Sequence, residues 1–251
     1  MTIYRSFLLG AIAFLLAACK GTQGAPTLQP TLYNITEKTG ETLPETDRSA
    51  EVAAMIAPYK EQLDAKMNQE LAVVKTPLVK ASPEGGLGNW MADIMMRAAS
   101  DQYPNRDIAF AATNPGGLRL QEIGTGPLLV SEIYELMPFD NKLVVLKLTG
   151  KEVREFIAHM ANSGGWPVSE ELEVDMTSGK LMVHISGTPL DDEAIYDVAT
   201  IDYVANGGSR ATMLKGKPLT DSGKFLRDVL IEYAGKTPEI EVMVEGKRMR
   251  L

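Results

Sequence analysis

Three short turn segments constrain this chain more than any other feature, because each one adjoins an apolar run at a sharp bend. They read TNPGGLR at residues 113–119, MPFDN at residues 137–141 and ANGGSR at residues 205–210. The first and third contain paired glycines, which adopt backbone conformations closed to other residues and leave backbone amides open to a ligand. A compatible fold must therefore place strand ends beside exposed loops.

Helical and strand patterns mix along the chain without strict β-α-β alternation. Apolar residues recur at helical spacing in residues 84–100, and residues 143–149 form an apolar run typical of a strand. Thr149 and Glu152 have the spacing of a capping box, so a helix should begin directly after that strand. The sequence therefore predicts an α+β fold with a mixed β-sheet flanked by helices. The other expected elements are helices at residues 47–71 (interrupted by Pro58), 131–136 and 221–233, strands at 107–113, 194–204 and 240–244, and a hairpin at 172–186.

The N-terminus predicts export. Residues 1–18 combine the cation Arg5 with an apolar core, at residues 7–16, that is too short to span a bilayer. The following Cys19 completes the sequence LAAC, which resembles a bacterial lipobox and predicts lipidation of Cys19; the alternative is an ordinary signal peptide with an incidental cysteine. Lys20 follows where aspartate would indicate retention at the inner membrane. We therefore expect a lipid-anchored protein of the bacterial cell envelope, at the outer membrane, facing either the periplasm or the outside.

The composition of the remaining residues predicts a tether followed by a folded domain. Residues 19–46 are rich in Thr, Pro, Gly and Gln and lack periodicity, which is typical of a flexible tether. Residues 47–251 carry the periodic patterns and form the predicted folded domain.

The formal net charge is −8, and cleavage after residue 18 would leave 24 Lys and Arg against 33 Asp and Glu. This acidic balance disfavours a nucleic-acid partner, which requires a basic surface.

The residues needed for metal-dependent or nucleophilic catalysis are sparse. A site for two metal ions requires several His with Asp and Asn, whereas this sequence has two His, His159 and His184, without partner spacing. Both are interpreted as structural or surface residues. Cys19 is the single cysteine, and the sequence contains no CxxC, HExxH or P-loop. We therefore predict no catalytic residue, no metal site and no cofactor within this chain.

The turn segments supply side chains suited to a flat, anionic ligand. Asn114 offers both a donor and an acceptor, as the edge of a base requires, and Arg119 can bind a phosphate with two parallel hydrogen bonds. Phe139 and Tyr203 are turn aromatics that could stack on the two faces of one ring. Taken singly, each residue is explained as well by a tight turn, a surface cation or a core aromatic. The full set of predicted binding residues is Asn114, Gly116, Gly117, Arg119, Phe139, Asn141, Tyr203, Gly207, Gly208 and Ser209.

Four blocks of sequence together resemble the C-terminal, substrate-binding domain of the 5'-nucleotidase family. EGGLGNWMAD at residues 84–93 is similar to the family's E-S-x-L-G-N-L-x-A-D, and residues 114–119 to its N-G-G-G-I-R. PFDNKLVVLKLTG at residues 138–150 resembles P-F-G-N followed by a strand and L-T-G. YDVATIDYVANGGSRA at residues 196–211 resembles Y-x-V-A-T-N-D-F-L-A-x-G-G-D-G-Y. The blocks follow the family's order and cover most of residues 76–233.

The resemblance implies roles for individual residues. Phe139 and Tyr203 would sandwich a base, Asn114 and Asn141 would contact the nucleoside, and Arg119 would hold phosphate or ribose oxygens. One departure stands out: Ser209 occupies the place of the family's aspartate, which accepts hydrogen bonds from ribose hydroxyls. Because a hydroxyl is a weaker acceptor than a carboxylate, ribose recognition is in question.

The resemblance leaves three functional hypotheses. In the first, the chain is the nucleotide-binding half of a split 5'-nucleotidase-type phosphohydrolase and presents the substrate phosphate to a separate metallophosphoesterase chain that carries the divalent metals. In the second, it is a non-catalytic nucleotide- or nucleoside-binding lipoprotein. In the third, it is a degenerate structural member that keeps only the fold. The retained Asn114, Arg119, Phe139 and Tyr203 favour the first two.

Overall fold

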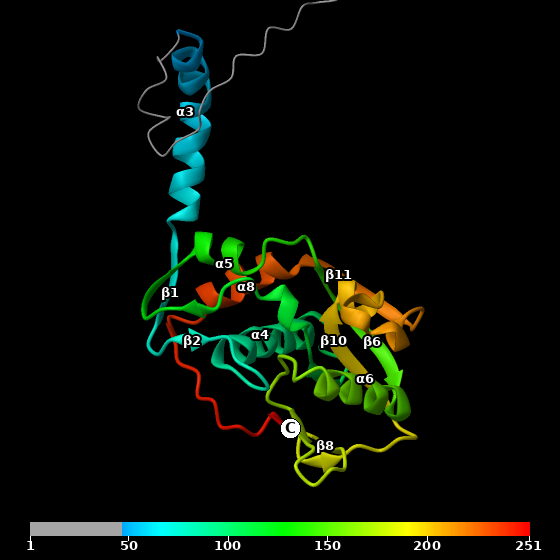
Figure 1. Ribbon diagram of the computed structural model, residues 1–251. Helices are drawn as coiled ribbons and strands as arrows, with labels where there is room; N and C mark the ends of the chain where they lie inside the picture. Colours follow the sequence, from blue (N-terminus) through cyan, green and yellow to red (C-terminus); the bar gives the residue numbers. More distant parts are fainter. Residues whose placement is uncertain (1–46) are drawn as a thin grey trace, which may run out of the picture. The chain divides into compact units, whose positions relative to one another are not determined.

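The structure of the protein is a computed structural model, and it describes residues 47–251 (Figure 1). The expected signal peptide, the lipidation of Cys19 and the tether lie outside the described residues and stay predictions. The chain divides into two units, residues 1–55 and Ile56–Leu251, and the second contains every feature discussed below except the start of the first described helix. Within the described residues, no helix is both long enough and apolar enough to cross a membrane.

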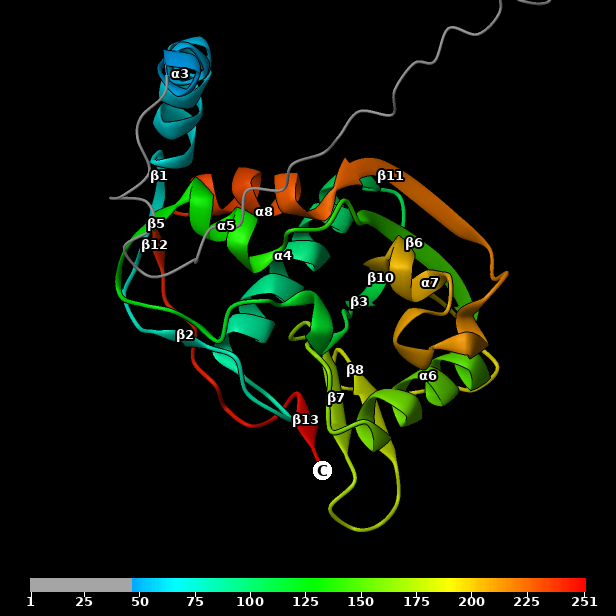
Figure 2. The same ribbon diagram turned by 45° about the horizontal axis from the view of Figure 1, so that its top comes forward.

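The central sheet has four strands in the order β11 (Leu219–Phe225), β6 (Lys142–Thr149), β10 (Ile195–Ile201) and β3 (Ile108–Ala111). β10 runs antiparallel to β6 and parallel to β3, which confirms the predicted mixed sheet (Figure 2). The neighbouring residues Val144 and Val145 point to opposite faces of β6, and both are buried, so the sheet is covered on both sides. Helices α4 (Gly86–Gln102) and α6 (Gly150–Asn162) both pack against β6 and β10.

Smaller sheets of order β12-β1-β5, β13-β7-β8-β9 and β2-β4 complete the fold. The helices are α3 (Asp47–Met67), α4 (Gly86–Gln102), α5 (Val130–Leu136), α6 (Gly150–Asn162), α7 (Asp202–Ala205) and α8 (Leu226–Gly235), with 3-10 turns η1 (Pro115–Gly117), η2 (Gly208–Arg210) and η3 (Thr212–Leu214). The strands are β1 (Glu70–Val74), β2 (Leu78–Val79), β3 (Ile108–Ala111), β4 (Glu122–Ile123), β5 (Gly126–Leu129), β6 (Lys142–Thr149), β7 (Leu172–Asp175), β8 (Met182–Ile185), β9 (Thr188–Pro189), β10 (Ile195–Ile201), β11 (Leu219–Phe225), β12 (Glu239–Ile240) and β13 (Met249–Arg250).

Two helices arise where the pattern predicts them. The apolar stripe of α4 is buried in the core, with Leu87, Met91 and Ile94 fully inaccessible. The capping box at the start of α6 is present: Thr149 Oγ1 accepts from Glu152 N at 3.4 Å, and Glu152 Oε2 accepts from Thr149 N at 2.8 Å. These two bonds satisfy amides that the first turn of a helix leaves without partners.

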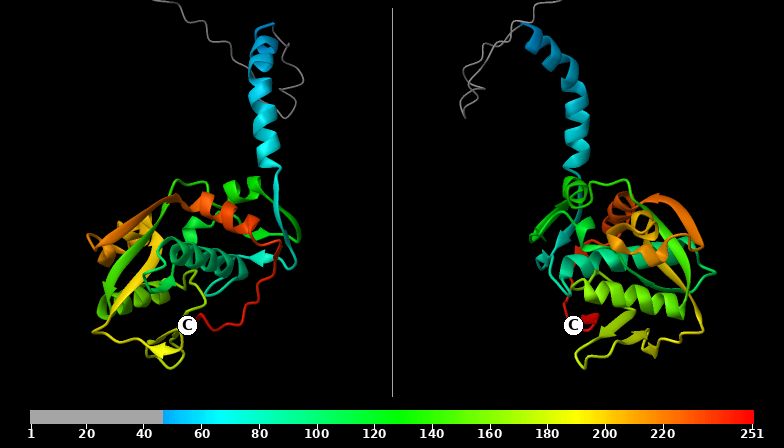
Figure 3. Two further views of the ribbon diagram at one scale, coloured as in Figure 1. Left: turned by 180° about the vertical axis from the view of Figure 1, so that it is seen from behind. Right: turned by 45° about the vertical axis from the view of Figure 1, so that its right-hand side comes forward.

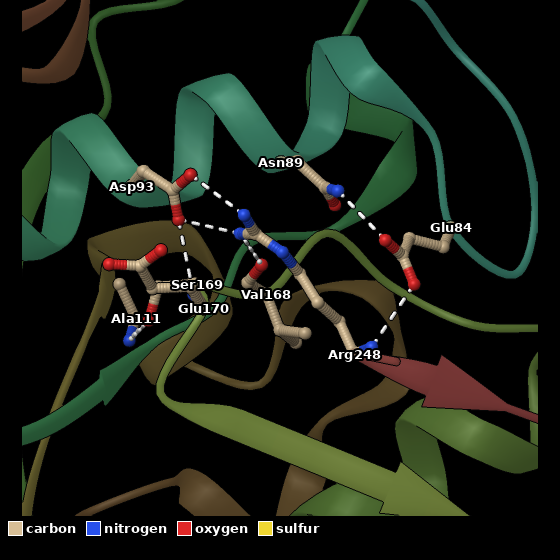
Figure 4. Close-up of polar contacts among 8 residues, drawn as sticks. All are labelled: Glu84, Asn89, Asp93, Ala111, Val168, Ser169, Glu170 and Arg248. Atoms are coloured by element: carbon tan, nitrogen blue, oxygen red, sulfur yellow. Dashed lines mark hydrogen bonds and ion pairs between the residues drawn. The ribbon is translucent and has the colours of Figure 1, made fainter. Parts of the chain in front are cut away.

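The polar residues at the start of α4 hold the C-terminal strand in place (Figure 4). The Arg248 guanidinium donates to both oxygens of Asp93, at 2.5 and 2.9 Å, and its backbone N donates to Glu84 Oε2 at 3.1 Å. Glu84 Oε1 in turn accepts from Asn89 Nδ2 at 2.9 Å. Figure 3 shows the chain running from α8 back to the β7–β8 hairpin, where β13 pairs with β7. The polar pattern at residues 84–93 therefore has a structural role here.

Several expected boundaries were wrong. The first helix ends at Met67, and residues expected to extend it form β1; Pro58 lies inside that helix and does not end it. The expected strand at 194–204 ends at Ile201, because Asp202 starts a short helix and its Oδ1 accepts from Tyr203 N at 2.7 Å. The expected strand at 240–244 is reduced to β12.

The expected helix at 221–233 was wrong in its first part. Asp221 was expected to start it, but residues up to Phe225 belong to β11, and α8 begins at Leu226. Asp221 Oδ1 accepts from Gly223 N at 2.7 Å, and Gly223 has a φ of +74°. The aspartate therefore stabilises a turn-like irregularity in an edge strand. Aspartate is also common at the start of helices, so the residue type alone does not distinguish the two.

Candidate functional site

The three turn segments of the sequence meet at one pocket of about 360 Å³. The first follows β3, the second precedes β6, and the third follows β10, so pairing within the central sheet brings them together. Every predicted binding residue lines this pocket except Gly207 and Gly208. The lining residues are Asn114, Gly116, Gly117, Arg119, Phe139, Asn141, Tyr203 and Ser209.

Asn114 is held deep in the pocket wall by the turn that follows it. Its carbonyl accepts from Gly117 N at 3.0 Å, and the residue is 5% exposed. A Cβ on Gly116 would lie 3.2 Å from Asn114 Nδ2, so the glycine keeps the amide group uncrowded. Asn114 Oδ1 is buried and has no hydrogen-bond partner among the described residues. An unpaired buried acceptor costs about 1–3 kcal/mol, so a donor from a ligand would be stabilising here.

Arg119 and Phe139 line the pocket close to each other. The Arg119 guanidinium lies 5.9 Å from the centroid of the Phe139 ring, within the range of a cation–π contact. The Arg119 backbone is anchored by a 2.9 Å bond from its N to the Leu136 carbonyl, whereas the side chain is exposed. Across residues 47–251, none of the ion pairs found involves Arg119. The guanidinium is therefore available to an anion.

Phe139 and Tyr203 present aromatic surface to the pocket. Phe139 is 38% exposed and Tyr203 48% exposed, so neither ring is a core residue. Next to Phe139, the carbonyl of Asn141 accepts from Leu226 N at 2.8 Å, which ties the turn to the start of α8. Two exposed rings from separate elements that line one pocket can contact the same flat ligand.

Gly207 and Gly208 shape the third turn without lining the pocket. Gly207 has a φ of +86°, which favours glycine. A Cβ on Gly208 would lie 2.5 Å from the Tyr203 ring, so only glycine leaves space for that ring. Figure 2 shows α7 and the turns after it beside β6 and α6. One neighbour of this turn was not expected from the sequence: His159 on α6 donates from Nε2 to the Ser209 carbonyl at 3.0 Å. No spacing pattern in the sequence points to that contact.

A second hollow is less suited to an anionic ligand. It has a volume of about 440 Å³, lies beside the pairing of Arg248 with Asp93 and is lined largely by carboxylates, among them Glu170, Glu173 and Glu241, which repel negative charge. Nowhere in residues 47–251 do three or more His, Cys, Asp or Glu side chains gather in a way that could hold a metal ion.

Comparison with known proteins identifies the domain. The profile of the 5'-nucleotidase C-terminal domain matches residues 70–216, a segment that contains all three turns and the first block at residues 84–93. The chain belongs to the 5'-nucleotidase C-terminal domain family. The resemblance noted in the sequence is thereby confirmed, and so is the α+β fold.

Individual relatives of this 5'-nucleotidase-type domain are much longer proteins. Protein UshA of Escherichia coli is 30% identical over 141 residues, which are 54% of this chain and 26% of UshA. The 5'-nucleotidase of Vibrio vulnificus is 28% identical over 199 residues, 74% of this chain and 34% of that protein. This chain therefore spans about a quarter to a third of these relatives.

Solved structures agree with the fold. The 5'-nucleotidase precursor of Thermus thermophilus superposes with a TM-score of 0.66 at 28% identity, covering 80% of this chain and 43% of that one. The NAD nucleotidase of Haemophilus influenzae superposes with a TM-score of 0.61 over 80% of this chain and 41% of that one; at 19% identity it shows a shared fold alone.

Proposed function

We propose that this protein binds a nucleotide or nucleoside in the pocket between Phe139 and Tyr203. We also propose that it acts as the binding half of a split 5'-nucleotidase-type phosphohydrolase in nucleotide catabolism. The observation that carries the proposal is the meeting of two exposed aromatic rings, the Arg119 guanidinium and the Asn114 amide in one pocket of a 5'-nucleotidase-family domain.

Each pocket residue has a chemical task in this proposal. Phe139 and Tyr203 stack on the base, and base–aromatic stacking contributes about 1–3 kcal/mol per base. Asn114 Oδ1, which has no partner among the described residues, accepts a hydrogen bond from the base edge or the sugar. Arg119 neutralises the phosphate. Because its guanidinium lies 5.9 Å from the centroid of the Phe139 ring, the sites for the base and the phosphate are adjacent.

The chemical step belongs, in this proposal, to a separate metallophosphoesterase chain that carries the divalent metals. Such ions activate water and neutralise charge on the phosphate. The present chain contributes binding and orientation, which convert an encounter between two molecules into a reaction within one complex. Anchoring through lipidated Cys19 would hold this binding half at the cell envelope, next to nucleotides outside the cytoplasm.

Reconstitution tests the split enzyme. The partner to use is a metallophosphoesterase that is encoded in the same genome and has no C-terminal domain of its own. Phosphate release from AMP is measured with Mn²⁺ or Zn²⁺ for each chain alone and for the two together. We expect no release by the present chain alone and a rise in kcat/KM when it is added to its partner. Phe139→Ala should lose that stimulation, because the base is no longer held.

Two outcomes would correct the proposal in different ways. Saturable AMP binding without stimulation of any such phosphoesterase would favour the non-catalytic binding lipoprotein. Steady phosphate release by the rigorously purified chain alone would show that it carries catalytic groups of its own. In both cases Tyr59→Ala is the matched control, because Tyr59 is an exposed aromatic on α3 that does not line the pocket.

A further inference from the structure

The turn at residues 207–210 is bonded on two sides through Ser209. The backbone N of Ser209 donates to the Tyr203 hydroxyl at 3.2 Å. The Ser209 carbonyl accepts from His159 Nε2 at 3.0 Å, and because a carbonyl can only accept, Nε2 must carry the proton. The two bonds of this single residue therefore connect α6 to an aromatic ring of the pocket.

The backbone of this turn is strained and needs such support. Ser209 has a φ of +50° and Arg210 a φ of +64°, both in the left-handed region that side chains disfavour. Strain of this kind persists only when surrounding contacts hold it in place, and it concentrates at ligand-binding sites. The hydrogen bonds from His159 and to Tyr203 are contacts of that kind.

The Tyr203 ring depends on the same turn for its orientation. Tyr203 is 48% exposed, so core packing alone does not fix its ring. The ring lies against Gly208, where an added Cβ would come within 2.5 Å of ring carbons, and its hydroxyl is bonded to Ser209. A phenylalanine here would keep the stacking surface and lose the bond that holds the ring.

His159 is itself fixed from the core. Its ring meets Trp166 edge-on, with centroids 5.5 Å apart and planes at 77°. Trp166 is 3% exposed, and its Nε1 donates to Ser163 Oγ at 3.0 Å. An unbroken set of contacts thus leads from the buried Trp166 through His159 and Ser209 to the Tyr203 ring.

We propose that His159 is a positioning residue, which acts through Ser209 and the Tyr203 hydroxyl to hold one aromatic wall of the pocket ready for stacking. This proposal rests on the proposed function, because it concerns how the same pocket binds its ligand. A ring held in place before binding loses less conformational freedom when the ligand arrives, which increases affinity. The hydroxyl of Tyr203 therefore contributes to binding without touching the ligand.

The test compares AMP affinity among four variants, measured by calorimetry. Tyr203→Phe and His159→Leu should each weaken binding by about two- to tenfold, the range expected for ordering one side chain or losing one hydrogen bond. His159→Gln should restore most of the loss, since its amide can donate to the Ser209 carbonyl. The double variant should bind about as weakly as either single variant, because both changes interrupt one connection.

A second measurement does not depend on the ligand. Hydrogen exchange at the Ser209 amide should speed up in Tyr203→Phe, whereas exchange in α4 should not change. Full additivity of the two substitutions, or wild-type affinity in both single variants, would overturn the positioning role. The proposed function would still stand in that case if Phe139→Ala weakens AMP binding. If the wild-type protein shows no saturable AMP or adenosine binding, the proposed function fails, and the positioning role fails with it.

Discussion

At the scale of single residues, Asn114 carries the clearest sign of function. Its Oδ1 is buried and lacks a partner among the described residues, although folded proteins pair nearly all such atoms. Gly116 and Gly117 lie close to this amide, and a side chain on Gly116 would crowd it. The chain thus keeps an unfavourable polar group at the wall of its pocket, which is expected where binding and stability compete.

Asn114→Leu should separate stability from binding. Leucine removes the unpaired acceptor and keeps the branched arrangement of heavy atoms, so the free energy of unfolding should stay within about 1 kcal/mol of wild type or rise. Affinity for AMP should fall about tenfold, because a hydrogen bond to the ligand is lost. Thermal unfolding and calorimetry measure the two quantities. A destabilised variant with unchanged affinity would show that the asparagine serves the fold.

At the scale of secondary-structure elements, the hydrogen bonds at the start of α6 also determine how stability depends on pH. The Lys217 ammonium, and then hydrogen bonds from Thr149, lower the pKa of Glu152 below its ordinary value. A carboxylate whose pKa is lower in the folded state stabilises the fold above its unfolded pKa. That stability is lost as the pH falls through the folded pKa.

Glu152→Gln should therefore be destabilising by about 1 kcal/mol at pH 7, and the difference from wild type should shrink toward zero in strongly acidic solution. Urea unfolding at a series of pH values measures this. Glu155→Gln is the matched control, because Glu155 is an exposed carboxylate on the same helix. A difference between Glu152→Gln and wild type that stays constant from neutral to acidic pH would contradict the assignment.

The pairing of Arg248 with Asp93, which joins β13 to α4, predicts a second effect on stability. Arg248 is 13% exposed, whereas Arg250, which pairs with Asp175, is 51% exposed. Arg248→Met should lower the free energy of unfolding by about 2 kcal/mol, because it leaves a partly buried Asp93 without its partner. Arg250→Met should cost less than about 1 kcal/mol. Because Arg248 lies outside the pocket, AMP affinity should not change in either variant, and equal losses of stability would contradict this role.

The elements that could be predicted are those whose signal is local. The stripe of α4 and the capping box of α6 depend on residues within one or two turns, so the sequence contains the whole cause. The boundary between β11 and α8 depends on pairing with β6, which is distant in the chain, and so Asp221 was assigned to the wrong element. The pocket residues were found by their turns and by family resemblance, whereas His159 comes close only through folding.

At the scale of the whole molecule, an acidic chain carries a local cation, Arg119, at its pocket. The formal net charge is −8, so the overall charge would repel an anionic ligand, and the local cation Arg119 would have to attract it. The matched segments are 26% of UshA and 34% of the Vibrio vulnificus 5'-nucleotidase. The split arrangement is a proposal, and a partner chain is needed to test it.

The predicted anchor is tested by Cys19→Ser. The wild-type protein should incorporate labelled fatty acid in a bacterial host and sediment with membranes, because two or three acyl chains give stable anchoring. Cys19→Ser should incorporate none and remain in the supernatant. If the wild-type protein is unlabelled and soluble, residues 1–18 are an ordinary signal peptide and the cysteine is incidental.

The most direct test of the account is a calorimetric titration of the purified protein, with Cys19 removed, by AMP and by adenosine. We expect saturable binding of both ligands, with AMP favoured through Arg119. We also expect a loss of about tenfold or more in Phe139→Ala, which removes a stacking surface, and no change in Tyr59→Ala. Affinity that is the same in wild type and Phe139→Ala, or no binding by the wild type at all, would contradict the claim that these turns form a nucleotide site.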